Sequence, residues 1–230
     1  MSDTYHLVAI NGKLTHEGNV SDYILKNATN TELEDVYKVY NFGPNGYCFH
    51  NDPNTYVRIP MKIESGKGYS IACYVMYKTS NNGTIGEDYV VPLWDDDNGA
   101  RYSIQLTDIS DRRPGCRIAG NDYAIHADFN SQYNTWYHLM LTKDENDIWR
   151  FFINGNLIGS YQYRINVTSY ISINAYDEWT SGVAQNLYIN DVFITGTCLA
   201  TENFDTWKIT EKVEDDHHSI AFPNHMYLYN

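Results

Sequence analysis

Residues 149–157, Trp-Arg-Phe-Phe-Ile-Asn-Gly-Asn-Leu, decide the fold of this chain. In an extended strand Trp149, Phe151 and Ile153 share one face, which predicts that this face points into a hydrophobic core. Asn154-Gly155 follows at once, and both residues tolerate positive φ. The stretch therefore predicts a tight β-hairpin that turns the chain into a second strand over Leu157–Tyr163.

Short runs that alternate apolar and polar residues, separated by Asn, Asp and Gly, continue on both sides of this hairpin. Helical signals are scarce: Thr31 and Glu34 form one possible capping box, which predicts a short helical turn. Many short strands in an unbroken chain predict an all-β fold of two packed antiparallel sheets. Besides Ile148–Ile153 and Leu157–Tyr163, the predicted strands are Thr55–Met61, Tyr69–Tyr77, Tyr89–Trp94, Tyr102–Thr107, Tyr123–Phe129, Trp136–Thr142, Tyr170–Ala175 and Asn186–Ile194.

The composition excludes several partners. The 230 residues carry a formal net charge of −13, whereas a protein that binds the phosphate backbone needs clustered Lys and Arg, so we expect no nucleic acid. The longest compact apolar stretch, Ile71–Met76, is too short to cross a bilayer, so we expect no membrane insertion. The chain begins without a basic segment followed by an apolar one, which predicts synthesis in the cytoplasm without a signal peptide. The four cysteines show no Cys-x-x-Cys spacing and are expected to be reduced thiols rather than two disulfides.

Three segments in the second half carry a resemblance to a known family. Residues 136–144, Trp-Tyr-His-Leu-Met-Leu-Thr-Lys-Asp, resemble the W-x-H-(apolar)3-T-x-D strand of concanavalin A-like, laminin-G-like (LamG) jelly rolls. Residues 151–157 resemble the Asn-Gly hairpin that follows in that family. Residues 187–194 are similar to its closing I-D-D-V-x-I strand, with Asn190 in place of the first acidic residue. Upstream, residues 47–60 and 69–75 resemble earlier strands of the same family.

The resemblance implies a two-sheet antiparallel jelly-roll sandwich of the lectin/glucanase type over residues 45–205. Residues 1–44 are expected to form an irregular N-terminal extension that packs on the sandwich, and residues 206–230 an irregular C-terminal tail. The family includes lectins, carbohydrate-binding modules, glycosidases, adhesion domains and virion proteins. The fold alone therefore does not select a function.

The sequence offers no catalytic pair of carboxylates. Glycoside hydrolysis needs two carboxyl groups at a defined separation, and the glucanase branch of the family carries them on one strand as E-x-D-x-(x)-E. No such run occurs here, and no nucleophile motif or phosphate-binding loop accompanies it. The sequence therefore predicts a protein that is not an enzyme and requires no cofactor.

Two loops combine tryptophan with acidic residues, as sugar recognition requires. Trp94 precedes Asp95 and Asp97, and Tyr176 and Trp179 flank a second acidic pair. Aromatic rings can stack on the C–H faces of a sugar while carboxylates bind its hydroxyls. The sequence leaves open that Trp94 instead ends a core strand and that Trp179 covers a sheet edge.

The turn that contains Asp95, Asp97 and Asn98 also has the oxygen ligands that calcium prefers. The spacing is not that of an EF-hand, and Asp-Asn-Gly is equally what a plain hairpin turn requires. Calcium is thus a possible ligand of this turn.

These observations favour a structural or interaction protein over an enzyme. The sequence-based prediction is an accessory, decoration or appendage protein on a bacteriophage virion surface. Its terminal segments would bind other virion proteins, and its sandwich would adhere weakly to cell-surface glycans, an affinity that repeated copies raise. The alternative is a carbohydrate-binding module or an atypical glycoside hydrolase that acts on polysaccharide.

Overall fold

A computed structural model describes residues 4–10, 13–18, 24–27, 37–44, 46–51, 55–59, 63–77, 89–95, 100–105, 113–118, 121–129, 131–164, 171–173 and 187–206. Nearly all of these residues are in strands or in the turns between them, and none is helical. The prediction of an all-β protein is confirmed.

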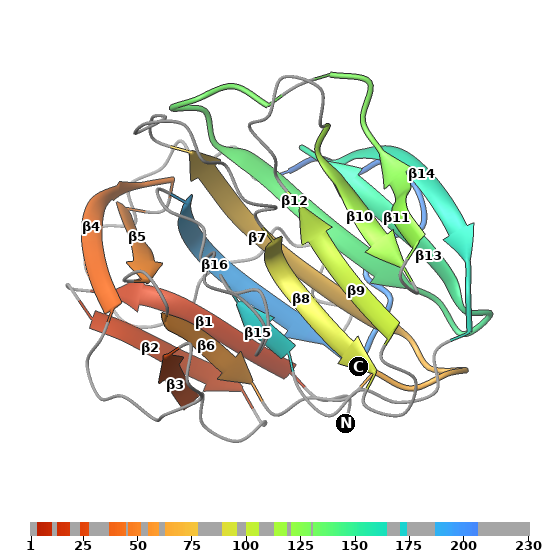
Figure 1. Ribbon diagram of the computed structural model, residues 1–230, viewed down its shortest axis with the longest axis horizontal. Helices are drawn as coiled ribbons and strands as arrows, with labels where there is room; N and C mark the ends of the chain where they lie inside the picture. The colour runs from red at the N-terminus through yellow and green to blue at the C-terminus, as the bar shows by residue number, and fades with distance from the viewer. Residues whose placement is uncertain are drawn as a thin grey trace.

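The described strands form two sheets that pack face to face. β8, β9 and β10 lie in front of β7, β12 and β13 in Figure 1. All described strand pairs are antiparallel, as expected for a jelly-roll sandwich. The nine-stranded sheet contains β1 (Thr4–Ile10), β2 (Lys13–Gly18), β4 (Tyr37–Gly43), β5 (Gly46–Asn51), β7 (Tyr69–Tyr77), β12 (Tyr137–Lys143), β13 (Ile148–Ile153), β14 (Asn156–Gln162) and β16 (Leu187–Thr195). The seven-stranded sheet contains β3 (Ile24–Asn27), β6 (Thr55–Ile59), β8 (Tyr89–Asp95), β9 (Ala100–Gln105), β10 (Gly115–Ile118), β11 (Asn121–His126) and β15 (Ile171–Ile173).

The predicted hairpin joins β13 to β14. Ile153 pairs with Asn156, and the two residues between them have positive φ, 49° at Asn154 and 77° at Gly155. Asn154 also accepts a hydrogen bond on Oδ1 from the backbone N–H of His138 at 2.9 Å. The turn is therefore tied to the neighbouring strand β12.

The hydrophobic core lies on the face of the nine-stranded sheet that points toward the other sheet. Paired positions on β7, β12 and β13 bring Ile71, Leu141 and Phe151 into one row, and all three are fully buried. Cys116 and Ile125 supply buried side chains from the seven-stranded sheet. Burying this apolar surface is the main force that holds the two sheets together.

The opposite face of the nine-stranded sheet is also covered. A row of Ala72, Met140 and Phe152 is buried beneath Leu199, Ala200 and Phe204, which follow the last strand. We call residues 197–206 the C-terminal strap. Because both faces are covered, every residue of β12 is buried, and the strand does not alternate between core and solvent.

The strap is held by hydrogen bonds as well as by packing. Ser70 Oγ donates to the carbonyl of Thr197 at 2.7 Å and accepts from the N–H of Leu199 at 2.9 Å. Thr142 Oγ1 donates to the carbonyl of Ala200 at 2.9 Å. The strap is irregular in conformation, but its backbone is fixed to the sheet.

The N-terminal region differs from the expectation of an irregular extension. β1, β2 and β4 belong to the nine-stranded sheet, and β3 belongs to the seven-stranded sheet. β1 pairs with both β2 and β16, and Ile10 pairs with Lys13 across the two residues Asn11-Gly12. The same Asn-Gly signal that marks the central hairpin is present here, but Leu7–Ile10 before it is a continuous apolar run that does not alternate.

Candidate functional site

The residues predicted to bind a glycan lie at positions that the structure describes only in part. Trp94 and Asp95 are the last two residues of β8, where Asp95 pairs with Ala100 of β9. Their side chains, and the whole of Asp97, Asn98, Tyr176 and Trp179, lie outside the described residues. The predicted glycan and calcium ligands thus stay predictions.

The backbone shows how the two predicted loops leave the seven-stranded sheet. β15 is antiparallel to β8, and its Ile171 pairs with Leu93. The chain therefore runs from Ile171 to Ile173 away from Asp95, toward the end of the sheet where β8 begins. The sheet does not place the start of the second loop beside the Asp95 turn.

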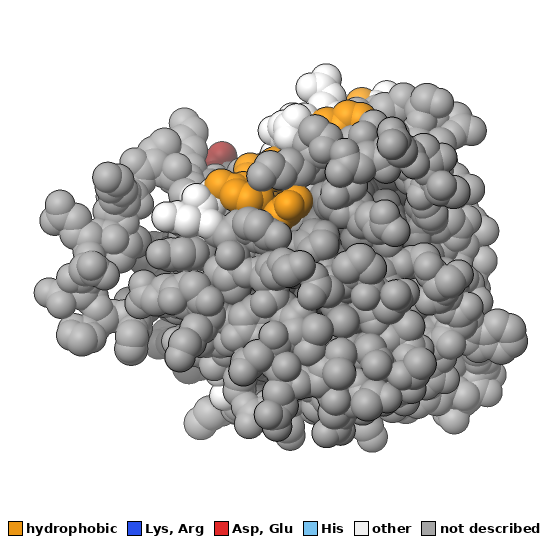
Figure 2. Space-filling model, turned by 60° about the vertical axis from the view of Figure 1, so that its left-hand side comes forward, with side chains coloured by type: hydrophobic (Ala, Val, Ile, Leu, Met, Phe, Trp, Pro, Cys, Tyr) orange, Lys and Arg blue, Asp and Glu red, His pale blue; other side chains and the backbone are white. Residues whose placement is uncertain are grey.

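The loop between β11 and β12 brings aromatic side chains to the surface at the end of the seven-stranded sheet where β8 begins. Of the three large hydrophobic side chains that are exposed among the described residues, two lie here: Phe129 is 42% exposed and Tyr133 is 38% exposed. The loop runs along the top of Figure 1. Figure 2 shows that hydrophobic side chains also reach the surface in the upper part of the face it presents.

The framework beneath this loop is buried and aromatic. Tyr137, the first residue of β12, is 7% exposed, and its ring stacks on Phe129 with centroids 6.1 Å apart. Trp136 packs against a second cluster formed by Cys48, Met76 and Tyr188. The alternating pattern placed Phe129 at the end of a predicted strand, and Tyr133 was not among the predicted site residues. The available signal was an aromatic residue within the polar run 130–135.

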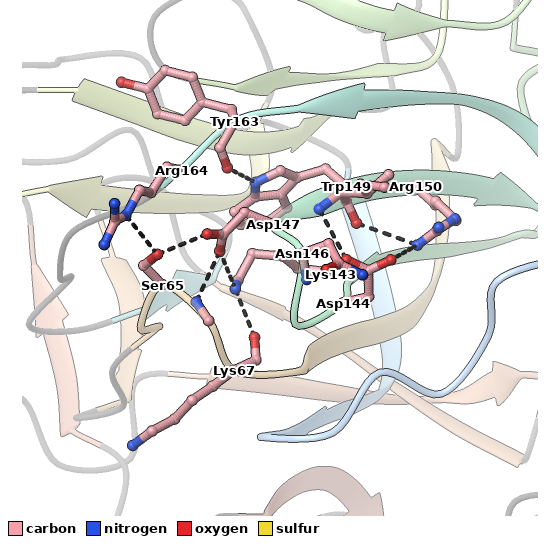
Figure 3. A network of polar contacts seen from close by, with 12 residues as sticks. Ser65, Lys67, Lys143, Asp144, Asn146, Asp147, Trp149, Arg150, Tyr163 and Arg164 are labelled. Atoms are coloured by element: carbon pink, nitrogen blue, oxygen red, sulfur yellow. Dashed lines mark hydrogen bonds and ion pairs between the residues drawn. The ribbon is translucent and has the colours of Figure 1, made fainter.

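A polar network lies at the other end of β12 (Figure 3). The side chain of Lys143 is fully buried, and its Nζ donates to Asp147 Oδ1 at 2.8 Å and to the carbonyl of Lys67 at 2.6 Å. Ser65 Oγ donates to Asp147 Oδ2 at 2.7 Å and accepts from Arg164 Nε at 3.0 Å. The network joins the β12–β13 turn to the segment before β7 and to the end of β14.

The carboxylates of this turn are engaged in structural contacts. Burial alone raises the pKa of Asp147, but hydrogen bonds from Lys143, Ser65 and Gly66 outweigh burial and hold the pKa below its usual value. The pKa of Asp144 is lowered in the same way, against burial, by hydrogen bonds from the N–H of Ile148 and from Arg150. Both groups are therefore anions that hold the turn together rather than candidate proton donors.

A third carboxylate, Asp191, is buried within the nine-stranded sheet. A β-bulge between Asn190 and Phe193 contains Asp191 with φ of 49°. Within the described structure neither of its carboxylate oxygens has a hydrogen bond, and the imidazole Nε2 of His6 on β1 lies 3.9 Å from its Oδ1. Burial raises the pKa of Asp191 to about 7 and lowers that of His6 to about 4.

His138 and Tyr74 form the same buried layer of the sheet. Their rings meet edge to face with centroids 4.9 Å apart, and burial lowers the pKa of His138 to about 4. Burial and the nearby Asp191 charge both raise the pKa of Tyr74. His138 is 3% exposed and is therefore a buried histidine of the sheet face.

Metal binding and membrane insertion find no support in the described residues. No three His, Cys, Asp or Glu side chains among them are grouped so that they could hold a metal ion. Within the same residues there is no helix of the length and hydropathy needed to span a membrane. Asp97 and Asn98 are outside the described residues, so calcium binding at the Asp95 turn stays a prediction.

Comparison with known proteins identifies the family. The model of the concanavalin A-like lectin/glucanases superfamily matches residues 51–197. The chain therefore belongs to this superfamily, and the resemblance stated from the sequence is confirmed. No curated protein matches the chain.

Solved structures show the same fold at low sequence identity. Domain 4 of AbnA, an extracellular arabinanase from Geobacillus stearothermophilus solved in complex with arabinotriose, is 15% identical with a TM-score of 0.59, and the match covers 78% of this chain and 84% of that one. The binding domain of botulinum neurotoxin serotype G is 18% identical with a TM-score of 0.53, over 85% of this chain. The binding domain of Paraclostridial Mosquitocidal Protein 1 is 15% identical with a TM-score of 0.58, over 86% of this chain. This chain spans about half the length of the two toxin domains, 48% and 50%.

Proposed function

We propose that this chain is a non-enzymatic carbohydrate-binding domain. The observation that carries the proposal is the pair of exposed aromatic rings, Phe129 and Tyr133, on a loop at the edge of a lectin-type sandwich. Exposed rings on a rigid β framework are suited to stack on sugar rings. Membership of the superfamily and the likeness to an arabinanase domain solved with arabinotriose support the same function.

The proposal of a binding rather than a catalytic role is supported by the contacts of three of the described carboxylates. Asp144 is held by Arg150, Asp147 is held by Lys143, and Asp191 is sealed inside the sheet. Glycoside hydrolysis needs two carboxyl groups that both reach the scissile bond. None of these three carboxylates is available for that chemistry without breaking a structural contact or opening the sheet.

Binding to a panel of polysaccharides tests the proposal directly. The purified chain is run through native gels that contain arabinan, xylan, mannan, mixed-linkage β-glucan or polygalacturonate, and retardation is measured against a gel without polysaccharide. At least one gel should retard the protein, and retardation should persist in EDTA because no cofactor is required. If no polysaccharide retards the chain, the proposed function is wrong.

Catalysis is checked on the same polysaccharides by assaying reducing ends after prolonged incubation. We expect no release above a heat-denatured sample. Release of reducing ends would favour the alternative of an atypical glycoside hydrolase.

The site predicted from sequence has its own test. Trp94→Ala with Trp179→Ala should abolish retardation and leave the melting temperature nearly unchanged if these side chains contact sugar. A large loss of stability would show instead that they are core residues.

The narrower prediction of a bacteriophage virion protein remains a prediction from the sequence. The superfamily match and the structural neighbours do not bear on it, and no described contact identifies a virion partner. The location of the protein is likewise left as predicted.

A further inference from the structure

The β11–β12 loop exposes two aromatic side chains that could bind one ligand together. Phe129 and Tyr133 expose 42% and 38% of their surface, although each belongs to a loop anchored on a buried framework. Exposed aromatic rings leave apolar surface in water, and a ligand that covers them gains the free energy of removing that surface from water.

A single buried side chain, Tyr137, fixes both parts of the loop. Phe129 stacks on its ring with an interplanar angle of 26°, and the N–H of Gln132, which precedes Tyr133, donates to its hydroxyl at 3.0 Å. Before Phe129, the N–H of Ala127 donates to the carbonyl of Pro114 at 2.8 Å. The Phe129 ring and the backbone that leads to Tyr133 are therefore held in place before any ligand arrives, which lowers the entropy lost on binding.

Polar groups surround the two rings. Asp128, next to Phe129, exposes 95% of its side chain and accepts a hydrogen bond from Arg113 Nη1 at 2.9 Å. Gln132, Asn134 and Thr135 are the other neighbours along the loop, and Gln132 and Asn134 are exposed. Rings for the C–H faces and polar side chains for the hydroxyls are the combination that a sugar needs.

The size and charge of this surface select the class of ligand. A stable protein–protein interface buries about 1,200–2,000 Å² with a central apolar core, whereas this loop offers two rings within a polar rim. The chain carries a net charge of −13, and the most exposed charged group beside the rings is the Asp128 carboxylate. Because Arg113 pairs with Asp128, it is the net charge of −13 that disfavours uronic and sialic acids and favours uncharged sugars.

We propose that Phe129 and Tyr133 form a binding platform for uncharged polysaccharides, with Asp128 and Arg113 as hydrogen-bonding groups for the hydroxyls. This inference rests on the proposed carbohydrate-binding function and assigns it to a site separate from the predicted Asp95 turn. The pairing Asp95–Ala100 marks one end of β9, and the pairings Gln105–Gly115 and Gly115–His126 lead from its other end to the loop. The platform and the Asp95 turn therefore lie at opposite ends of the seven-stranded sheet.

The test compares Tyr133→Ala, Tyr133→Phe and the double variant Phe129→Ala/Tyr133→Ala with Leu157→Ala. Leu157 is the matched control because it is also 38% exposed but is aliphatic and belongs to β14. The probes are the neutral polysaccharides and polygalacturonate named above, and melting temperatures confirm that each variant folds. If Phe129→Ala unfolds the loop, the two single Tyr133 variants still decide the result, because Tyr133 is not the residue stacked on Tyr137.

We expect the double variant to lose retardation by neutral polysaccharides at least tenfold, and Tyr133→Ala to lose part of it. Tyr133→Phe, which keeps the ring, and Leu157→Ala should bind like the wild type. If the wild type binds but the Phe129 and Tyr133 variants bind equally well, the platform is wrong while the proposed function stands. Preferential retardation by polygalacturonate would overturn the assignment to uncharged ligands, and dimerisation of the wild type that the double variant abolishes would assign the rings to a protein partner.

Discussion

At the scale of single residues, the buried Lys143 is the clearest source of stability outside the hydrophobic core. Its ammonium group has no contact with solvent and donates to Asp147 and to the carbonyl of Lys67. Lys143→Ala leaves Asp147 without its main partner, and breaking a buried pair in this way costs about 3–5 kcal/mol. Urea denaturation should show this loss in the free energy of unfolding.

Lys67→Ala is the matched control for this prediction. Lys67 contacts Glu64, but its side chain is 70% exposed, so the ion pair is screened by solvent. An exposed pair contributes at most about 1 kcal/mol. Equal destabilisation by the two alanine variants would show that the buried network is not a special source of stability.

Asp191 makes the stability of the protein depend on pH in a direction that is unusual for a carboxylate. Its pKa is raised by burial to about 7, so the folded state binds a proton more tightly than the unfolded state does. The stabilisation from the protonated group is complete below the unfolded pKa of about 4 and is lost as the pH rises through about 7. Asp191→Asn cannot ionise, and its melting temperature should rise relative to the wild type between pH 5 and pH 8.

The two buried histidines, His6 and His138, change the stability with pH in the direction opposite to Asp191. Comparing Asp191→Asn with the wild type separates the contribution of Asp191 from that of the histidines. The pKa values of His6 and His138 are lowered to about 4, so their contribution to stability is lost as the pH falls from about 6.5 to 4. The loss from His138 is common to both proteins, whereas His6 lies 3.9 Å from Asp191 and is coupled to the substitution, so the two proteins are best compared above about pH 6.5, where both histidines are neutral. A difference in melting temperature that stays constant from pH 5 to pH 8 would mean that Asp191 does not titrate in this range.

At the scale of elements, the Asn154-Gly155 turn supports the C-terminal strap as well as its own hairpin. A Cβ atom on Gly155 would clash with the carbonyl oxygen of Phe204. The N–H of Phe204 also donates to the carbonyl of Gly155 at 2.9 Å. Gly155→Ala should therefore displace the strap and expose the apolar row beneath it.

Gly66→Ala separates this clash from backbone strain. Gly66 has φ of 73°, close to that of Gly155, but apart from its chain neighbours no atom of the described residues lies within 4 Å of a Cβ placed on it. Left-handed strain alone costs about 1–2 kcal/mol. We expect Gly155→Ala to lower the free energy of unfolding by clearly more than Gly66→Ala, and similar losses would argue against the role of the strap contact.

The elements that could be predicted from the sequence are those with a complete local signal. β7 and β13 begin and end at the predicted residues. Their runs of nine and six residues are rich in β-forming residues, and turn-forming residues follow each run in the sequence. β10 was missed because its four residues, Gly115–Ile118, include a glycine and an arginine and become a strand only through β9 and β11. The strap could not be predicted, since its contacts with Ser70 and Thr142 join residues more than fifty positions apart.

The candidate platform was missed for a related reason. Phe129 follows the alternation of β11, so the sequence assigned it to the strand, but β11 ends at His126. The exposure of Phe129 and Tyr133 depends on how the loop folds over Tyr137, which local sequence does not specify. Tryptophan beside acidic residues is a stronger sequence signal for a sugar site, and it predicted Trp94 and Trp179 instead.

At the scale of the whole molecule, the four cysteines provide a test of the packing. All four are free thiols; Cys48, Cys73 and Cys116 are buried, and Cys198 is half-buried. Burial raises the pKa of Cys73 to about 12 and raises that of Cys116 as well, so neither forms the reactive thiolate near neutral pH. A thiol reagent should therefore label Cys198 first in the native protein and all four cysteines in urea. A reducing agent should leave the melting temperature unchanged, and a drop on reduction would reveal a disulfide.

The position of β16 has a consequence for how the chain reaches this structure during synthesis. β16 lies between β7 and β1, so the first strand of the domain takes its place only after residues 187–195 have been made. A ribosome would therefore release almost the whole domain before the larger sheet can close, and such long-range pairing makes folding slow. A chain arrested before residue 187 should stay sensitive to protease, whereas a chain that extends through the strap should become resistant. Protection of the shorter chain would show that the sheet can assemble without its central closing strand.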